Sequence, residues 1–169
     1  MKKTLLVDGY NVIFAVADLR RHIPKNSQAA REGVTSLCHL FKSKRRDIEE
    51  VIVVFDGRKN EEVMQQKATP TTTHIYTTEK EDADRRIFKL VREAEDPASL
   101  LVVSSDRGVY DRARTWGAEV MTAHEFIKYV EVKSSASSGG ASKAAAIEKK
   151  LSPRAAEIIT KEYKDFLGL

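Results

Sequence analysis

Cysteine is almost absent from this sequence, since Cys38 is the only one in 169 residues. An internal disulfide framework is therefore excluded. Cys38 lies among Val34, Leu37 and Phe41, which recur at the spacing of one helix face. The pattern predicts that Cys38 packs as a small apolar side chain and has no role as a catalytic nucleophile.

Histidine is also scarce, and the four histidines are widely spaced: His22, His39, His74 and His124. Their positions lack the spacing of zinc ligands. We expect His39 on the exposed side of its helix and His74 in or beside a strand. The sequence therefore gives no indication of a zinc site.

Long hydrophobic runs are missing as well. No stretch approaches the roughly 20 apolar residues that a transmembrane helix needs. The apolar run 5–7 near the start is broken at once by Asp8 and Asn11, which argues against a signal peptide. The sequence predicts a cytoplasmic protein that does not associate with membranes.

Charge is plentiful and only slightly unbalanced, with 29 Lys and Arg against 25 Asp and Glu and a net charge of +4. The basic residues come in three clusters: Arg20, Arg21 and Lys25; Lys42, Lys44, Arg45 and Arg46; and Arg58 with Lys59. Such clusters suit a polyanionic partner, but a solvated surface is at least as common an explanation.

Short apolar runs alternate with helical patterns along the chain. The runs predict strands at 5–7, 51–55, 74–76, 100–103 and 119–121, and apolar periodicity predicts helices at 30–41, 83–94, 110–116 and 123–130. Strands that alternate with helices indicate parallel pairing through right-handed crossovers. We therefore expect an α/β fold, a three-layer sandwich with a central, mainly parallel sheet.

A change of composition divides the chain. Residues 1–131 carry the alternating pattern, 132–151 form a linker rich in Ser, Gly, Ala and Lys, and 152–169 read as an amphipathic helix. The sequence gives neither the docking site of that helix nor the oligomeric state.

Aspartates follow the predicted strands where these end. Asp8, Asp56 and Asp106 come directly after strands, and Asp84 falls in the first turn of the helix after the third strand. Side chains at the carboxyl ends of parallel strands converge on one edge of the sheet. Any single Asp there is explained as a turn residue or helix cap. Four together would repel one another unless a cation such as Mg²⁺ or Mn²⁺ neutralised them.

Asp82 and Asn11 are close in sequence to these carboxylates. Asp82 is better placed as the helix cap, whereas Asp84 follows the buried Ala83 and so lies beside the sheet. Asn11 has two equally good explanations, as a hydrogen-bond partner of a carboxylate or phosphate and as a turn former or cap.

An acidic, metal-binding edge fits phosphodiester hydrolysis, because a metal-held water needs no protein nucleophile. Two other acidic α/β enzymes fit less well. A haloacid-dehalogenase-type phosphatase needs a second Asp two residues after the first, where this chain has Tyr10. A phosphoacceptor receiver needs paired acids at the first strand and a late Lys, and neither is evident.

Four segments in order resemble the NYN-domain family, in particular its bacterial YacP-like branch within the PIN-like nuclease superfamily. They are LVDGYNVI at 6–13, VVFDG at 53–57, ADRRI at 83–87 and SSD at 104–106. The resemblance implies a metal-dependent endoribonuclease that acts on mRNA in association with the ribosome. It also implies that Asp8, Asp84 and Asp106 bind the metal.

The same resemblance marks Asp56 as an additional catalytic acid, with Asn11 and Ser105 in support. RNA would need phosphate contacts at this edge, and the candidates are Arg58, Lys80 and Arg107. Tyr10 is a candidate for stacking on a base, with a place in the core as an equal alternative. The main rival function is an inactive RNA- or ribosome-binding module of the same fold.

Overall fold

The computed structural model describes residues 1–21, 28–57 and 62–132. The linker and the last helix expected from the sequence lie outside these residues, apart from the first linker position. That part of the domain division stays a prediction.

A six-stranded sheet forms the middle of the protein, in the order β3-β4-β2-β1-β5-β6. Its strands are β1 (Lys3–Asp8), β2 (Ile48–Phe55), β3 (Met64–Thr69), β4 (Thr72–Tyr76), β5 (Leu100–Val103) and β6 (Glu119–Met121). Every pairing is parallel except that between β3 and β4. The expected α/β sandwich with a mainly parallel sheet is confirmed.

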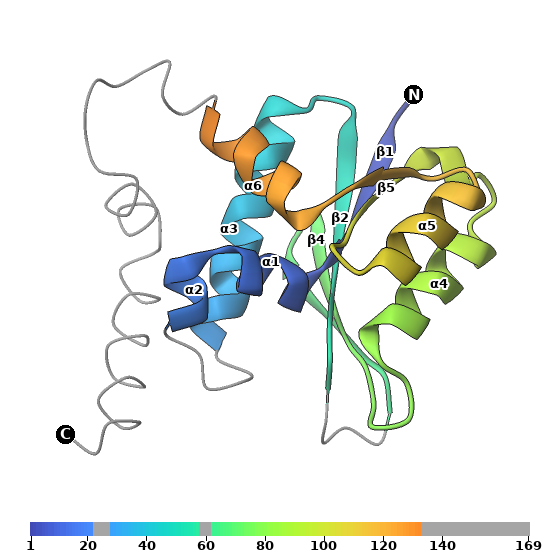
Figure 1. Cartoon of the computed structure of the whole chain (residues 1–169), viewed down its shortest axis with the longest axis horizontal. Coiled ribbons are helices and arrows are strands. Elements are labelled where there is room, and N and C mark those ends of the chain that lie inside the picture. The colour runs from blue at the N-terminus through green and yellow to red at the C-terminus, as the bar shows by residue number, and fades with distance from the viewer. Residues whose placement is uncertain (22–27, 58–61, 133–169) are drawn as a thin grey trace.

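Helices cover both faces of this sheet (Figure 1). One face carries α1 (Gly9–Ala15), α2 (Ala17–Arg21), α3 (Gln28–Lys44) and α6 (Ala123–Val132). The other carries α4 (Ala83–Glu93) and α5 (Arg107–Thr115), and a short 3₁₀ turn (Pro97–Ser99) leads into β5. Among the helices in the described ranges, none is long and apolar enough to cross a membrane.

Two hydrophobic cores result, because successive side chains of a strand point to opposite faces. On β1, Leu5 and Val7 face the α1, α3 and α6 layer, where they pack with Phe41 and Phe126. Leu6 faces the other way, into the core beneath α4 and α5. Burial on both faces explains why β1, β2 and β5 read as continuous apolar runs.

Three elements were not predicted from the sequence. α1 and α2 follow β1 almost directly, where the Asp-Gly-Tyr-Asn segment looks like a turn. β3 is a polar edge strand with the sequence MQQKAT, and its side chains are almost all exposed. An exposed edge strand needs no apolar residues, so hydrophobic periodicity does not find it.

Candidate active site

Asp8 is the last residue of β1 and the N-cap of α1, and it is buried, with 2% of its surface exposed. Asn11 donates to both of its oxygens, from the backbone N–H to Oδ1 (3.2 Å) and from Nδ2 to Oδ2 (2.7 Å). The carboxylate is therefore fixed in orientation at the end of the strand.

Asn11 also reaches the neighbouring strand. Its Oδ1 accepts a hydrogen bond from the backbone N–H of Ser105 (2.7 Å), just after β5. The Ser105 hydroxyl in turn accepts from the backbone N–H of Ala123 at the start of α6 (3.1 Å). Asn11 thus ties the ends of β1 and β5 together while it holds Asp8.

Asp106 and Asp82 are both helix N-caps. Asp106 accepts from the Val109 N–H at the start of α5 (3.0 Å), and Asp82 accepts from the Arg85 N–H in α4 (2.8 Å). The capping explanation therefore holds for Asp106 as well as for Asp82. Capping occupies one oxygen of Asp106 and leaves its exposed carboxylate able to bind a cation with the other.

Asp84 differs from these residues. It is half-buried in the first turn of α4, and within the part of the chain that the structure describes its carboxylate accepts no hydrogen bond. The choice of Asp84 over Asp82 as the residue beside the sheet agrees with this placement.

Asp56 joins β2 to α4. One of its oxygens accepts a hydrogen bond from the Ala83 N–H (2.7 Å), and the N–H of the next residue, Gly57, donates to the Thr77 hydroxyl (3.2 Å). These contacts fix the ends of β2 and β4 against the start of α4. Asp56 therefore has a structural task as well as a place at the acidic edge.

The surroundings of Asp8 and Asp84, which include the other acidic side chains, raise the pKa values of these two carboxyl groups. Burial raises the pKa of Asp8 from its ordinary 3.8 to about 7; Asp84 and Asp56 add to the rise, and the hydrogen bonds from Asn11 oppose it. Burial likewise raises the pKa of Asp84 to about 6, with further increases from Asp106, Asp82 and Asp56. The expected gathering of Asp8, Asp56, Asp84 and Asp106 at one edge agrees with these effects.

The donor set suits a hard divalent cation, because it consists of carboxylate oxygens and includes one with no hydrogen bond. Across residues 1–21, 28–57 and 62–132, no three His, Cys, Asp or Glu side chains stand as a ready-made metal cluster. Mg²⁺ commonly keeps several waters and takes only one or two protein carboxylates. A hydrated ion therefore matches this open arrangement better than a closed protein cage does.

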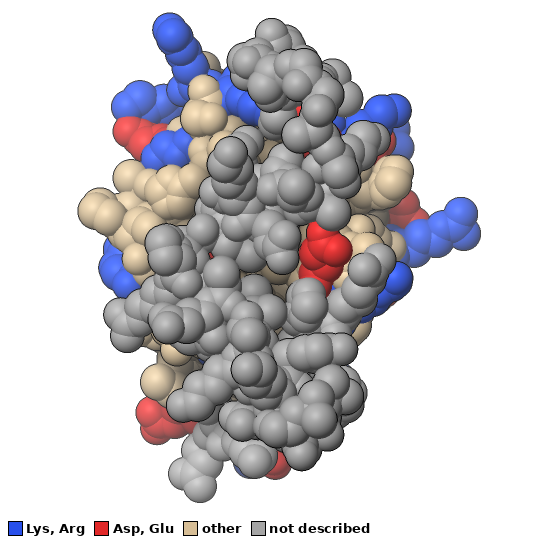
Figure 2. Space-filling view, turned by 90° about the vertical axis from the view of Figure 1, so that its left-hand side faces the viewer, with Lys and Arg blue, Asp and Glu red and all other residues tan. Residues whose placement is uncertain are grey.

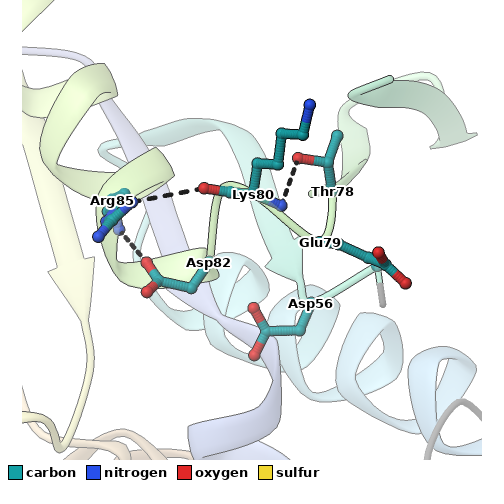
Figure 3. Close-up of a pocket in the computed structure, with 7 residues that line it drawn as sticks. Asp56, Thr78, Glu79, Lys80, Asp82 and Arg85 are labelled. Atoms are coloured by element: carbon teal, nitrogen blue, oxygen red, sulfur yellow. Dashed lines mark hydrogen bonds between the residues drawn. The ribbon is translucent and has the colours of Figure 1, made fainter. Parts of the chain in front are cut away.

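A pocket of about 580 Å³ adjoins the carboxylates. It is lined by Asp56, Gly57, Thr78, Glu79, Lys80, Asp82 and Arg85 (Figure 3). Lys80 was a predicted RNA contact, whereas the pocket and Arg85 were not singled out from the sequence. Arg85 lies within the ADRRI segment, five residues after Lys80. This short separation from a predicted RNA contact could have identified Arg85 from the sequence.

The other predicted RNA contacts are Arg107, Arg58 and Tyr10; of these, the structure describes Arg107 and Tyr10, and neither lines the pocket. Arg107 is exposed at the first position of α5, directly after Asp106. Arg58 lies outside the described residues. Tyr10 is half-buried and packs its ring edge-on against Phe55 (5.9 Å between centroids) and beside Phe14 (6.3 Å).

Gly9 explains how α1 comes so close to the end of β2. A Cβ at this position would lie 2.3 Å from Cε1 of Phe55, so any other residue would force the Phe55 ring or α1 to shift. Asp8 precedes Gly9, and Asn11 follows it two residues later. The close approach of α1 to Phe55 therefore helps to position both side chains at the acidic edge.

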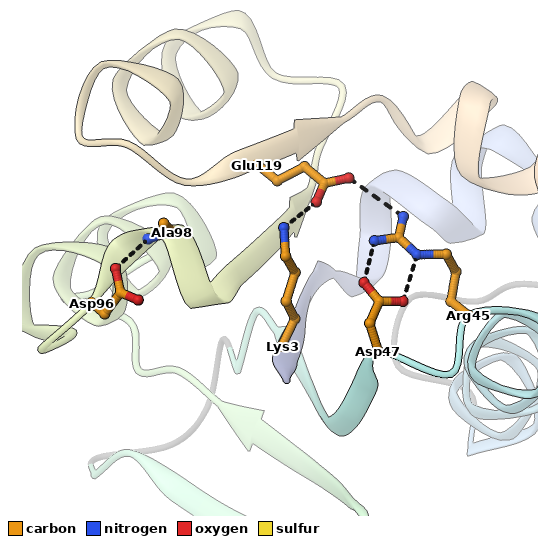
Figure 4. Close-up of polar contacts among 6 residues, drawn as sticks. All are labelled: Lys3, Arg45, Asp47, Asp96, Ala98 and Glu119. Carbon is orange, nitrogen blue, oxygen red and sulfur yellow. Dashed lines mark hydrogen bonds and ion pairs between the residues drawn. The ribbon is translucent and has the colours of Figure 1, made fainter. Parts of the chain in front are cut away.

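The cluster of basic residues around Arg45 lies at the other end of the sheet, where the parallel strands begin. Arg45 binds Asp47 and Glu119, and Lys3 binds Glu119 (Figure 4). Lys42 and Lys44 donate to backbone carbonyls. This cluster therefore stabilises the fold.

On the face shown in Figure 2, the visible Lys and Arg side chains lie mainly around the margin.

Cys38, His39 and His74 lie where the sequence placed them. Cys38 is fully buried, His39 is exposed, and His74 lies buried in β4. The Thr35 hydroxyl donates to the Arg31 carbonyl and contacts Nε2 of His74 (2.8 Å). Since the Thr35 hydroxyl proton is used in the bond to the Arg31 carbonyl, Thr35 accepts from Nε2–H of His74, which places the proton of the neutral imidazole on Nε2.

Comparisons with known proteins agree with this architecture. A curated relative, "Uncharacterized protein YacP" of Bacillus subtilis (strain 168), is 30% identical over 132 residues, which cover 75% of this chain and 74% of the relative. A crystal structure of a mutant of Rae1 (YacP) from Bacillus subtilis matches with a TM-score of 0.61 and 25% identity, over 94% of this chain and 98% of that one.

A second crystal structure of Rae1 (YacP) from Bacillus subtilis gives a TM-score of 0.59 and 27% identity, covering 99% of this chain and 88% of the other. The family model described as the YacP-like NYN domain matches residues 5–166. The chain therefore belongs to the YacP-like NYN domain family and has the nuclease-like fold of the PIN-like superfamily.

Proposed function

We propose that this protein is a divalent-metal-dependent endoribonuclease that hydrolyses phosphodiester bonds in RNA, with mRNA on the ribosome as its natural substrate. The observation that carries the proposal is the set of like-charged carboxylates at the carboxyl edge of the sheet, whose burial and repulsion raise the pKa values of Asp8 and Asp84. A fold holds such groups together at a cost, which a function at the site explains.

Asp8, Asp84 and Asp106 are the residues proposed to hold Mg²⁺ or Mn²⁺. When bound, the cation supplies a more acidic water and stabilises charge on the phosphate. Asn11 keeps Asp8 in orientation, and Ser105 fixes the position of Asn11 through its backbone N–H. Asp56 positions the start of α4, and with it Asp84, through the Ala83 N–H.

Basic and aromatic residues around this edge are proposed to hold the RNA. Arg107, Lys80 and Arg58 offset the repulsion between the carboxylates and the phosphates of the substrate. Tyr10, which is half-buried beside Phe55 and Phe14, is the residue proposed to stack on a base. The ribosome and mRNA enter the proposal through the family resemblance, which the membership in the YacP-like family supports.

Exchanging one carboxylate at a time tests the site. We expect Asp8→Asn and Asp84→Asn to abolish cleavage, because each removes an oxygen ligand with its charge. Asp96→Asn is the matched control for Asp84→Asn: it removes the same charge from an exposed N-cap just before β5 and keeps a good cap, so cleavage should stay within a few-fold of wild type.

Cleavage should be measured on a naked RNA and on an mRNA in a translation reaction, with Mg²⁺, Mn²⁺ or a chelator. Undiminished cutting by a folded Asp8→Asn/Asp84→Asn double variant would overturn the site. RNA or ribosome binding by wild type with no metal-dependent cutting in either reaction would favour the binding-module function.

A further inference from the structure

Two basic side chains line the pocket beside Asp56, and neither forms an ion pair with a described residue. Lys80 and Arg85 are both exposed and both line it, together with Asp56, Glu79 and Asp82. Acidic side chains are thus close at hand, yet neither cation forms an ion pair with any of the residues that the structure describes. The Arg85 guanidinium makes only a long hydrogen bond to the Lys80 carbonyl (3.4 Å).

The arrangement in Figure 3 separates the two signs of charge. The Lys80 side chain extends away from the carboxylates of Asp56 and Asp82, toward the top of the view. Arg85 lies on the α4 side, where the Asp82 carboxylate accepts a hydrogen bond from the Arg85 backbone N–H. The cations are therefore available to an external anion, while the carboxylates of Asp56 and Asp82 accept hydrogen bonds from backbone N–H groups.

Hydrogen bonds hold the two segments that carry Lys80 and Arg85. The Thr78 hydroxyl accepts from the backbone N–H groups of Lys80 and Glu81 (3.2 Å each), which fixes the turn that carries Lys80. Asp56 fixes the start of α4, which carries Arg85, through the Ala83 N–H. The same contact makes Asp56 a shared wall between the pocket and the acidic edge.

The size and chemistry of the pocket define what it can hold. At about 580 Å³ it falls within the common range of small-ligand pockets, roughly 300–1,000 Å³, which is large enough for a nucleotide. Two free cations bind a phosphate, and carboxylate oxygens accept hydrogen bonds from ribose hydroxyls and base amino groups. A phosphate alone would leave most of the volume empty and would face the acidic wall.

We infer that this pocket binds one nucleotide of single-stranded RNA next to the bond that is cut, with Lys80 and Arg85 on its phosphate. The inference rests on the proposed function, since Asp56 connects the pocket to the candidate catalytic edge. It adds Arg85 as a substrate-positioning residue. It also predicts a preference for unpaired RNA, because a nucleotide held in a double helix cannot enter a pocket.

Binding separates this inference from catalysis. The probe is a fluorescein-labelled single-stranded RNA 12-mer of mixed sequence, titrated with the full-length Asp84→Asn protein at several salt concentrations in the presence of a chelator. Each lost phosphate contact lowers the slope of log K against log salt by about 0.7 on a single strand. Lys80→Gln and Arg85→Gln should each reduce the slope by that amount, and the double variant by about 1.4.

Arg114→Gln is the matched control, because it removes one exposed positive charge from the last turn of α5, at the opposite end of that helix from Asp106. The same 12-mer annealed to its complement is the second probe and should bind more weakly than the single strand. The inference is overturned if Lys80→Gln/Arg85→Gln matches Arg114→Gln in affinity and slope, or if the duplex binds as tightly as the single strand. Either result leaves the cleavage test of Asp8 and Asp84 unaffected.

Discussion

Asn11 is the residue on which the geometry of the candidate site depends most directly. Its amide contacts Asp8 through the nitrogen and Ser105 through the oxygen, so both ends of the side chain are used between two strand ends. The sequence left two explanations open for Asn11, and the structure favours the hydrogen-bond partner of a carboxylate. Asp8 and not Asn11 is the cap of α1.

Replacing Asn11 with Ala should lower cleavage and metal affinity while the fold persists. Removing a partner that orients a metal ligand typically costs about 10- to 100-fold. Ser105→Ala is the comparison, because the Ser105 hydroxyl contacts the start of α6 and not Asp8. We expect a smaller effect from Ser105→Ala. The Mg²⁺ concentration dependence of cleavage measures both variants, and equal activity of Asn11→Ala and wild type would contradict the role of Asn11.

The aspartates show what sequence reasoning at single residues achieves. Their positions after apolar strands predicted that they lie on one edge, because the direction of parallel strands is fixed by the connections between them. Their hydrogen bonds could not be predicted. Whether Asp56 is free or accepts from Ala83 depends on the angle at which α4 meets the sheet, and that angle is set by packing of the whole core.

Among the elements, β4 carries the least usual core residue. His74 is 6% exposed, its Nε2 contacts Thr35 of α3, and its Nδ1 lies 3.2 Å from the Tyr76 hydroxyl. Burial lowers the pKa of His74 from its ordinary 6.5 to about 4, and the neighbouring Arg31 adds to the effect. Protonation would therefore put an unpaired charge between the sheet and α3.

Stability should depend on pH through this histidine. Because the folded-state pKa lies below the unfolded value, the unfolded chain takes up the proton first, and stability is lost as pH falls from about 6.5 toward 4. Between pH 6.5 and 4.5 wild type should lose about 2 kcal/mol of unfolding free energy relative to His74→Gln. Urea unfolding at each pH measures the gap.

The matched control for that experiment is His39→Gln, which removes an exposed imidazole from α3. Parallel pH curves for wild type and His74→Gln would contradict the linkage. The sequence placed His74 in or beside a strand but did not show its partners, since Thr35 comes from a helix 39 residues away.

Elements with an apolar run or an apolar face were predicted, whereas the polar edge strand β3 and the two short helices after β1 were not. α3 and α4 each bury a stripe of residues, so their periodicity is visible in the sequence. α1 has seven residues, of which Gly9, Val12 and Ile13 are buried, and two turns are too short for a period to emerge. α5 begins three residues earlier than expected because Asp106 caps it.

At the scale of the whole molecule, the two ends of the sheet treat charge in opposite ways. Where the strands begin, Lys3, Arg45, Asp47 and Glu119 pair in a network that holds the pKa values of Asp47 and Glu119 below their usual range, chiefly through hydrogen bonds from Arg45 and Lys3 respectively. Where the strands end, burial raises the pKa values of Asp8 and Asp84, and neighbouring carboxylates add to the rise. One end therefore supports the fold, and the other weakens it while its carboxylates are ionised and not neutralised.

This contrast predicts how pH and metal act on stability. A carboxyl group whose folded-state pKa is raised gives stability that is present at low pH and lost as pH rises through that pKa. For Asp8 the loss between pH 5.5 and 8 amounts to about 2 kcal/mol, since one pKa unit corresponds to about 1.4 kcal/mol. In chelator, the unfolding free energy of Asp8→Asn minus that of wild type should therefore grow by about this amount over the interval. The difference also cancels the contribution of His74.

Adding Mg²⁺ should restore the stability that wild type loses at high pH, and it should have little effect on the stability of Asp8→Asn. A ligand that binds only the folded state stabilises it by mass action, and at pH 8 the ionised carboxylates bind the cation without first losing a proton. We expect Mg²⁺ to raise the Tm of wild type at pH 8 more than at pH 5.5, and to leave the Tm of Asp8→Asn nearly unchanged. Asp111→Asn, an exposed substitution on α5, controls for the loss of one negative charge and should respond as wild type does. An equal Mg²⁺ response in Asp8→Asn would place the cation elsewhere, because the acidic edge would then be stabilised without its most buried carboxylate.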